Sequence, residues 1–217
     1  MKRGTTDAFI LGIFGALLFW GGSLGAFTPL EVRAETSAVS NASSTSETPF
    51  DQVKVTCDEL VAAVKEFPGE DKLTERRAKL RTIITPRFDF NTMAQASLGA
   101  HWKEISDEER QEFVAVFSDL LAKTYLSRIE NIKENTVKVE SEKLISADRA
   151  LVNTEVTHKG ETFPINYRLL KSDGKWRVYD VIIENIGLVL NYRNEFSGII
   201  RKEQFSGLMK KLRAKQI

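Results

Sequence analysis

The stretch from Phe88 to Ile132, FDFNTMAQASLGAHWKEISDEERQEFVAVFSDLLAKTYLSRIENI, determines how we interpret the rest of this chain. It predicts a short helix, a glycine break and then one long amphipathic helix. Ser106 and Glu109 have the S-x-x-E spacing of a capping box, which marks the start of the long helix. Beyond this cap, apolar residues recur at steps of three and four, so the long helix is expected to pack against a large apolar surface.

Two further helices are predicted before this stretch. Thr48 followed by Pro49 is a helix-start signal, and this helix is expected to end at Phe67-Pro68-Gly69. A second helix is expected from Asp71 to Ile84. Its outer face is basic, and we interpret that face as a solvated surface made by Arg76, Arg77, Lys79 and Arg81.

After Asn135 the apolar pattern changes to a period of two, which predicts strands. Ser172-Asp173-Gly174 is a hairpin-turn signal between two of them. The expected strands are residues 136–145, 149–158, 162–171 and 175–184. Because short turns join consecutive strands, we expect an antiparallel meander of about four strands. Residues 185–217 are predicted to be helical again, which makes the fold class α+β, with helices packed on a sheet.

The N-terminus has the layout of a secretory signal. Lys2 and Arg3 precede an apolar run, and Val32-Arg33-Ala34 fits a small-residue cleavage site. The alternative is an uncleaved anchor over residues 8–30, although five glycines weaken that segment as a membrane helix. We therefore divide the chain into a signal peptide (1–34), a flexible Ser/Thr-rich leader (35–48) and an α+β domain (49–217).

Composition narrows the class of function. Removing residues 1–34 takes away three basic and two acidic residues and leaves 28 of each sign, so there is no electrostatic case for nucleic-acid binding. The single cysteine, Cys57, excludes an intramolecular disulfide and is interpreted as a small core residue. A chain of 217 residues can bury one sizeable core.

No catalytic residue, metal ligand or cofactor is predicted. The two histidines, His101 and His158, are far apart, and no nucleophile or phosphate-loop motif is present. One enzyme alternative stays open, an acid–base site built on Asp180 and Glu184 beside aromatic residues. A protein–protein adaptor with a dry core is a second alternative.

Several spaced motifs occur in both halves of the chain. In the first half they are Phe88-Asp89-Phe90, Leu98-Gly99 and Trp102. In the second half they are Tyr167-Arg168-Leu169, Gly174-Lys175-Trp176, Val178–Val181 and Leu188–Phe196. Together these motifs resemble the MlaC family of periplasmic phospholipid carriers, also called the toluene-tolerance family. The resemblance covers residues 49–213. Gly187, where the family often has serine, and residues 202–204 depart from the pattern and leave the subfamily open, including relatives linked to hopanoid lipids.

The resemblance implies a monomeric periplasmic carrier for a glycerophospholipid. Its implied partners are an inner-membrane ABC transporter with MCE domains and an outer-membrane lipoprotein–porin complex. We expect an apolar cavity between a sheet face, carrying Phe163, Ile165, Tyr167 and Leu169, and the helix of Phe113 and Phe117. The full expected lining is Phe113, Phe117, Leu121, Val152, Phe163, Ile165, Tyr167, Leu169, Trp176 and Val178.

Overall fold

The computed structural model describes residues 48–130, 136–158 and 160–215. The predicted signal peptide and all of the predicted leader except Thr48 lie outside these residues. The helices are α2 (Pro49–Glu66), α3 (Leu73–Ile84), α4 (Phe90–Leu98), α5 (Asp107–Ile129) and α6 (Leu188–Ala214), with short 3₁₀ turns η1 (Thr85–Arg87) and η2 (Gly99–Lys103). No described helix is long and apolar enough to cross a membrane.

Two of the predicted helix starts, those of α2 and α5, are confirmed by their caps. The Thr48 hydroxyl accepts a hydrogen bond from the Asp51 amide at 3.1 Å, and the Asp51 carboxylate accepts one from the Thr48 backbone amide at 3.4 Å. Ser106 and Glu109 form the same reciprocal pair at the start of α5, at 3.2 and 2.9 Å. Gly99 ends α4 with a φ of 59°, a backbone conformation that glycine adopts at little cost.

The strands form one antiparallel sheet in the order β1-β2-β3-β4-β5. They are β1 (Val137–Ser146), β2 (Arg149–His158), β3 (Glu161–Ser172), β4 (Lys175–Ile183) and β5 (Ile186–Gly187). The α+β class is confirmed, and the predicted meander gains one two-residue strand. Asp173 and Gly174 make the predicted turn, both with positive φ. Glu184 and Asn185 also have positive φ, and the turn they make adds β5.

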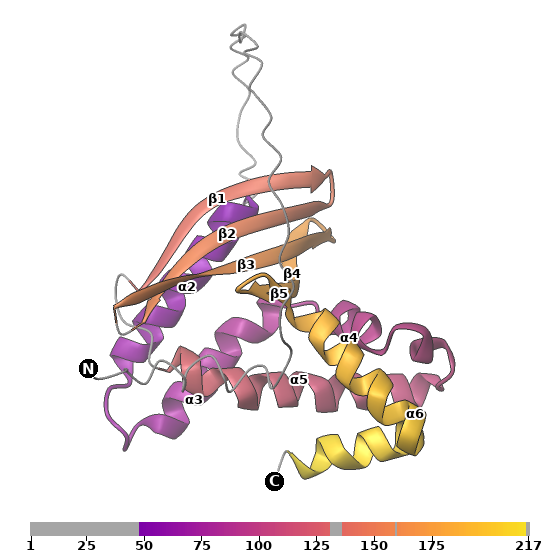
Figure 1. The fold of residues 1–217 in the computed structure, drawn as a ribbon. Helices are drawn as coiled ribbons and strands as arrows, with labels where there is room; N and C mark the ends of the chain where they lie inside the picture. Colours follow the sequence, from indigo (N-terminus) through magenta and orange to yellow (C-terminus); the bar gives the residue numbers. More distant parts are fainter. Residues whose placement is uncertain (1–47, 131–135, 159, 216–217) are drawn as a thin grey trace, which may run out of the picture. The chain divides into compact units, whose positions relative to one another are not determined.

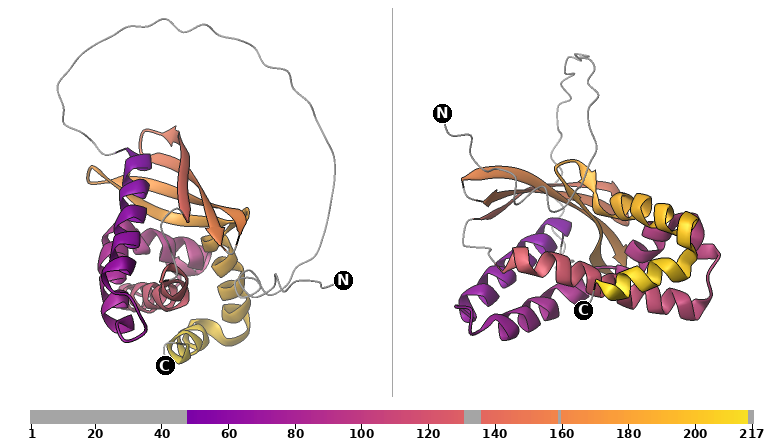
Figure 2. Two further views of the ribbon diagram at one scale, coloured as in Figure 1. Left: turned by 90° about the vertical axis from the view of Figure 1, so that its left-hand side faces the viewer. Right: turned by 60° about the horizontal axis from the view of Figure 1, so that its bottom comes forward.

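The described helices lie on one side of the curved sheet (Figures 1 and 2). Helix α2 runs beneath β1 and β2, and Figure 1 shows it crossing under the strands. Its Val53 packs against the inner face of the sheet, in a cluster with Ala150, Val152 and Leu169. Alternate residues of β2, β3 and β4 therefore face the side of the sheet on which α2 lies, as the period of two requires.

A second cluster joins α4, α5 and α6, and it is built on aromatic rings. Phe113 and Phe117 stack with their centroids 5.6 Å apart, and Phe196 meets both rings edge-on. Tyr192 adds a further edge contact to Phe117 at 5.3 Å. The expectation that Phe113 and Phe117 face the β3 residues is corrected here, since α6 supplies the partners of both rings.

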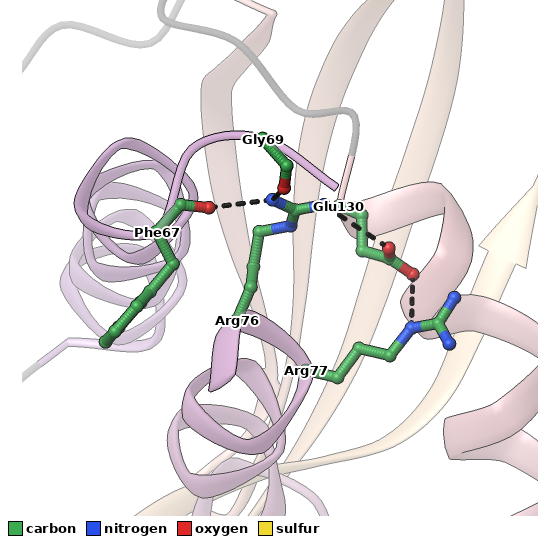
Figure 3. A network of polar contacts seen from close by, with 5 residues as sticks. All are labelled: Phe67, Gly69, Arg76, Arg77 and Glu130. Atoms are coloured by element: carbon green, nitrogen blue, oxygen red, sulfur yellow. Dashed lines mark hydrogen bonds and ion pairs between the residues drawn. The ribbon is translucent and has the colours of Figure 1, made fainter. Parts of the chain in front are cut away.

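The basic outer face predicted for α3 is also corrected at one position. Arg76 is buried, and its guanidinium donates to the carbonyl oxygens of Phe67 and Gly69 at 2.7 and 2.8 Å. Glu130, just after α5, lies 2.9 Å from Arg77 Nε and 3.8 Å from Arg76 (Figure 3). This network ties the turn between α2 and α3 to the end of α5. The charge pattern missed it because a helix face rich in cations is usually solvated.

Candidate functional site

The inner face of the sheet changes character along its length. At one end, Ala150, Val152 and Leu169 are fully buried against α2. Toward the other end, Phe163 and Ile165 on β3 are only half-buried, although they point to the same face. Apolar side chains on the covered face of a sheet are normally buried completely, so this end has surface to offer to something else.

We define the apolar wall as the half-buried inner-face residues of this region together with their neighbour on α2. Val139 on β1 and Cys57 on α2 pack against the buried part of the sheet. Tyr167 lies beside Val152 across the β2–β3 ladder. The apolar wall consists of Cys57, Val139, Phe163, Ile165 and Tyr167.

The two titratable side chains of the apolar wall, Cys57 and Tyr167, are poorly hydrated. Burial raises the pKa of the Cys57 thiol to about 11, with a smaller contribution from Asp58. Burial also raises the pKa of the Tyr167 phenol, and the nearby thiol adds to the shift. Both side chains nevertheless keep accessible surface. A side chain that is poorly hydrated yet incompletely covered is expected where a surface is recessed among protein atoms.

A cleft of about 810 Å³ lies at the end of the inner face opposite the apolar wall, beside the buried residues, where α2, η1, α4, α5 and β4 meet. Its aromatic residues include Trp176 and Phe88, which also belong to the cluster beneath the sheet. The cleft is lined by Gln52, Thr85, Pro86, Arg87, Phe88, Asp89, Phe90, Asn91, Val114, Ser118, Gly174, Lys175, Trp176 and Arg177. It is thus polar at its surface and apolar where it touches the core.

The structure brings most of the predicted lining residues together on the sheet. Seven of them lie on the inner face of β2, β3 or β4: Val152, Phe163, Ile165, Tyr167, Leu169, Trp176 and Val178. Phe113, Phe117 and Leu121 belong instead to the aromatic cluster of the helices. Sequence reasoning missed Val53 and Cys57 as the residues that face the sheet. Their i, i+4 spacing placed them on one helix face but did not reveal what that face meets.

Asp180, one of the two residues of the enzyme alternative, has a structural role in this fold. This carboxylate is buried and accepts hydrogen bonds from the Val189 amide and from Arg168 Nη1, both at 3.0 Å. It therefore holds the start of α6 against the sheet. Glu184 is exposed. Among the described residues, no group of three or more histidine, cysteine or acidic side chains is arranged to hold a metal ion.

The fold and the apolar wall define an α+β protein with an apolar surface enclosed between a curved sheet and helices. Residues 54–214 match the family model described as MlaC protein, so the chain belongs to the MlaC family.

Comparison with individual proteins also finds similarity to phospholipid-binding and toluene-tolerance proteins. The chain is 21% identical over 173 residues to the intermembrane phospholipid transport system binding protein MlaC of Haemophilus influenzae, covering 76% of this chain and 80% of that protein. It is 24% identical over 160 residues to the toluene tolerance protein ttg2D of Pseudomonas putida, covering 72% and 74%. A phospholipid-binding protein from Ralstonia solanacearum, solved in complex with a phospholipid, superposes with a TM-score of 0.68 at 28% identity, covering 76% of this chain and 94% of that one.

Proposed function

We propose that this chain is a periplasmic phospholipid carrier whose apolar wall receives the acyl chains of its cargo. The observation that carries the proposal is the row of half-buried apolar residues on the covered face of β3, where a protein without cargo would be closed. The phospholipid-bound relative from Ralstonia solanacearum supports it, since that protein has the same fold at 28% identity.

The physics of transport explains why such a wall is needed. Exposing an acyl chain to water costs about 0.8 kcal/mol per CH₂, so a two-chain lipid faces a cost on the order of 20 kcal/mol. A carrier must replace the apolar contact that the lipid loses when it leaves a membrane. The wall offers aliphatic and aromatic side chains with few polar groups, which suits acyl chains.

We further propose that the carrier moves lipid between an outer-membrane lipoprotein–porin complex and an inner-membrane ABC transporter with MCE domains. The name of the Haemophilus influenzae relative, an intermembrane phospholipid transport system binding protein, supports this route. The signal-like N-terminus supports secretion to the periplasm, with cleavage after Ala34. No catalytic step is part of this function.

The test is to place a charge on the wall and ask whether lipid still co-purifies. Tyr167→Glu puts a carboxylate where the phenol now faces a dry surface, and we expect the stoichiometric lipid adduct to disappear. Asn166→Glu is the matched control, because Asn166 lies one residue away on the opposite face of β3. The protein is expressed with its own N-terminal segment, purified without detergent and measured by native mass spectrometry, followed by extraction and identification of the lipid.

The outcomes separate cleanly. A diacyl phospholipid bound to the wild type and to Asn166→Glu, but lost from a folded Tyr167→Glu, supports the carrier. A folded Tyr167→Glu that retains its lipid shows that the wall is not the acyl site. A wild-type protein that stays lipid-free even after incubation with liposomes contradicts the carrier function itself and favours the adaptor. A bound hopanoid identifies the cargo as another envelope lipid.

A further inference from the structure

Helix α6 is sharply kinked at Gln204. This residue has a φ of 61° and a ψ of 179°, a combination that only glycine adopts at low cost. We define the α6 tail as residues 205–214, which follow the kink, and Figure 1 shows α6 bending back at this point. A residue other than glycine keeps such a conformation only where the packing around it holds it in place.

The packing that holds the kink is that of the α6 tail on the helical core. The tail buries three apolar side chains in the aromatic cluster, namely Leu208, Met209 and Leu212. Its Phe205 approaches Phe113 of α5, with the two ring centroids 6.1 Å apart. Its Arg213 forms an ion pair with Glu112, also on α5. These contacts between the tail and α5 compensate for the strained backbone at residue 204.

The local sequence, by contrast, favours a straight helix through this region. Residues 199–206 contain neither glycine nor proline, so no local signal ends the helix there. A straight α6 would nevertheless turn the tail away from its own core. Phe196 and Phe205 are nine residues apart, which at 3.6 residues per turn is about two and a half turns. The apolar face of the tail would then point opposite to the face that Phe196 buries, where only a second molecule can cover it.

Gly207 shows how tightly the chain folds back at the kink. A Cβ atom added at Gly207 would lie 2.4 Å from the Cβ atom of Glu203, far inside the normal contact distance of two carbon atoms. In a straight helix the Cβ atoms of residues four apart are separated by about 5–6 Å, so this clash would not occur. The kinked form therefore requires glycine at position 207, whereas a straight α6 does not.

We propose that two copies of this chain exchange their α6 tails and form a domain-swapped dimer, with Gln204 as the hinge. Each α6 straightens, and its tail packs on α5 of the other copy. Phe205 then meets Phe113 of that copy, and the pair of Arg213 with Glu112 forms again between the chains. A second copy fits this surface because the exchanged tail remakes the contacts of the kinked monomer while both hinges lose their strain. The kinked form is the monomer that the family resemblance implies, and the dimer is its second state.

The first experiment measures how the hinge controls the dimer. Purified protein is held at high concentration in urea below its unfolding midpoint, so that tails can open, and is then dialysed and studied by sedimentation velocity over a dilution series. We expect Gln204→Gly to raise the dissociation constant of the dimer about tenfold or more, because glycine removes the strain from the monomer. Gln204→Ala is the matched control, since it also removes the side chain but keeps the strained Cβ, and it should not weaken the dimer.

Gly207→Ala tests the same hinge in the opposite direction. Its added Cβ clashes with Glu203 only in the kinked form, so we expect the dissociation constant of the dimer to fall about tenfold or more. Gly198→Ala is the matched control, because it replaces another α6 glycine at which a Cβ would meet no atom within 4 Å. This control should leave the dissociation constant unchanged.

A cross-link distinguishes tail exchange from ordinary association. Glu112→Cys and Arg213→Cys are prepared as two separate proteins, each also carrying Cys57→Ser so that no other thiol is present. The two proteins are mixed, taken through the same urea step and treated with a short bis-maleimide. Exchange places the tail of one protein on α5 of the other, so a covalent heterodimer should form.

A dimer that gives this cross-link, weakens in Gln204→Gly and strengthens in Gly207→Ala supports the inference. A dimer without the cross-link is an association of unexchanged chains and overturns it. Wild-type and Gly207→Ala proteins that both stay monomeric at every concentration overturn it as well. An equal weakening by Gln204→Gly and Gln204→Ala contradicts the strained hinge as the cause of exchange.

Discussion

The aromatic cluster of α4–α6 and the apolar wall are both made of large apolar side chains, yet they are covered very differently. Phe113, Phe117 and Phe196 are fully buried and meet one another at stacked and edge-on angles. Ile165 and Tyr167, on the covered face of the sheet, keep part of their surface accessible. Closed aromatic contacts stabilise the fold, whereas an incompletely covered apolar surface gains its full contact only when something else binds.

The comparison predicts its largest effect at the centre of the closed cluster. Phe117→Ala removes a ring that contacts Phe113, Tyr192 and Phe196, and it leaves a void that the neighbours fill only in part. We expect the free energy of unfolding to fall by about 3–5 kcal/mol. Urea denaturation of lipid-free protein measures it, and a loss below about 1 kcal/mol would show that this cluster is as loosely covered as the wall.

A smaller effect is expected where the network of Figure 3 holds the α2–α3 turn to the end of α5. The Glu130 carboxylate is buried and pairs with Arg76 and Arg77, and Glu130→Gln removes its charge. We expect a loss of about 1–3 kcal/mol in the free energy of unfolding. Glu112→Gln is the control, because the Glu112–Arg213 pair is about half-exposed and is worth less than about 1 kcal/mol. Equal losses in the two variants would remove the special role of Glu130.

These residues also show what the sequence could predict. The start of β2 at Arg149 and of β4 at Lys175 followed from alternation and turn chemistry, which are local properties. Phe113 was correctly expected to be buried, but its partner was not, because periodicity identifies a covered face without identifying what covers it. No sequence pattern indicated that Gln52 is buried, since a polar residue in the first turn of a helix is usually exposed.

On the wall, truncation is expected to separate stability from binding. Ile165→Ala removes apolar surface that is only half-covered, so the free energy of unfolding should fall by only about 1 kcal/mol. Leu169 lies four residues further along β3 and is fully buried, so Leu169→Ala should lower the free energy of unfolding by about 2–5 kcal/mol. Lipid co-purification should decrease in Ile165→Ala despite its small cost. Equal unfolding costs at the two positions would mean that the inner face is closed along its whole length.

The smallest effect on stability comes from a chemical probe of the wall that leaves the fold unchanged. Cys57 is the only cysteine, so the mass added by iodoacetamide reports on it alone. Burial disfavours the thiolate and raises the pKa to about 11 from 9.0, which lowers the thiolate fraction at pH 8 by roughly a hundredfold. Alkylation of the lipid-free protein should therefore be slow at pH 8 and rise about tenfold per pH unit through pH 10, without the levelling near pH 9 expected of the denatured control. Rapid alkylation at pH 8 would place Cys57 in contact with bulk water and contradict a dry wall, whereas further slowing by bound phospholipid would show that acyl chains cover it.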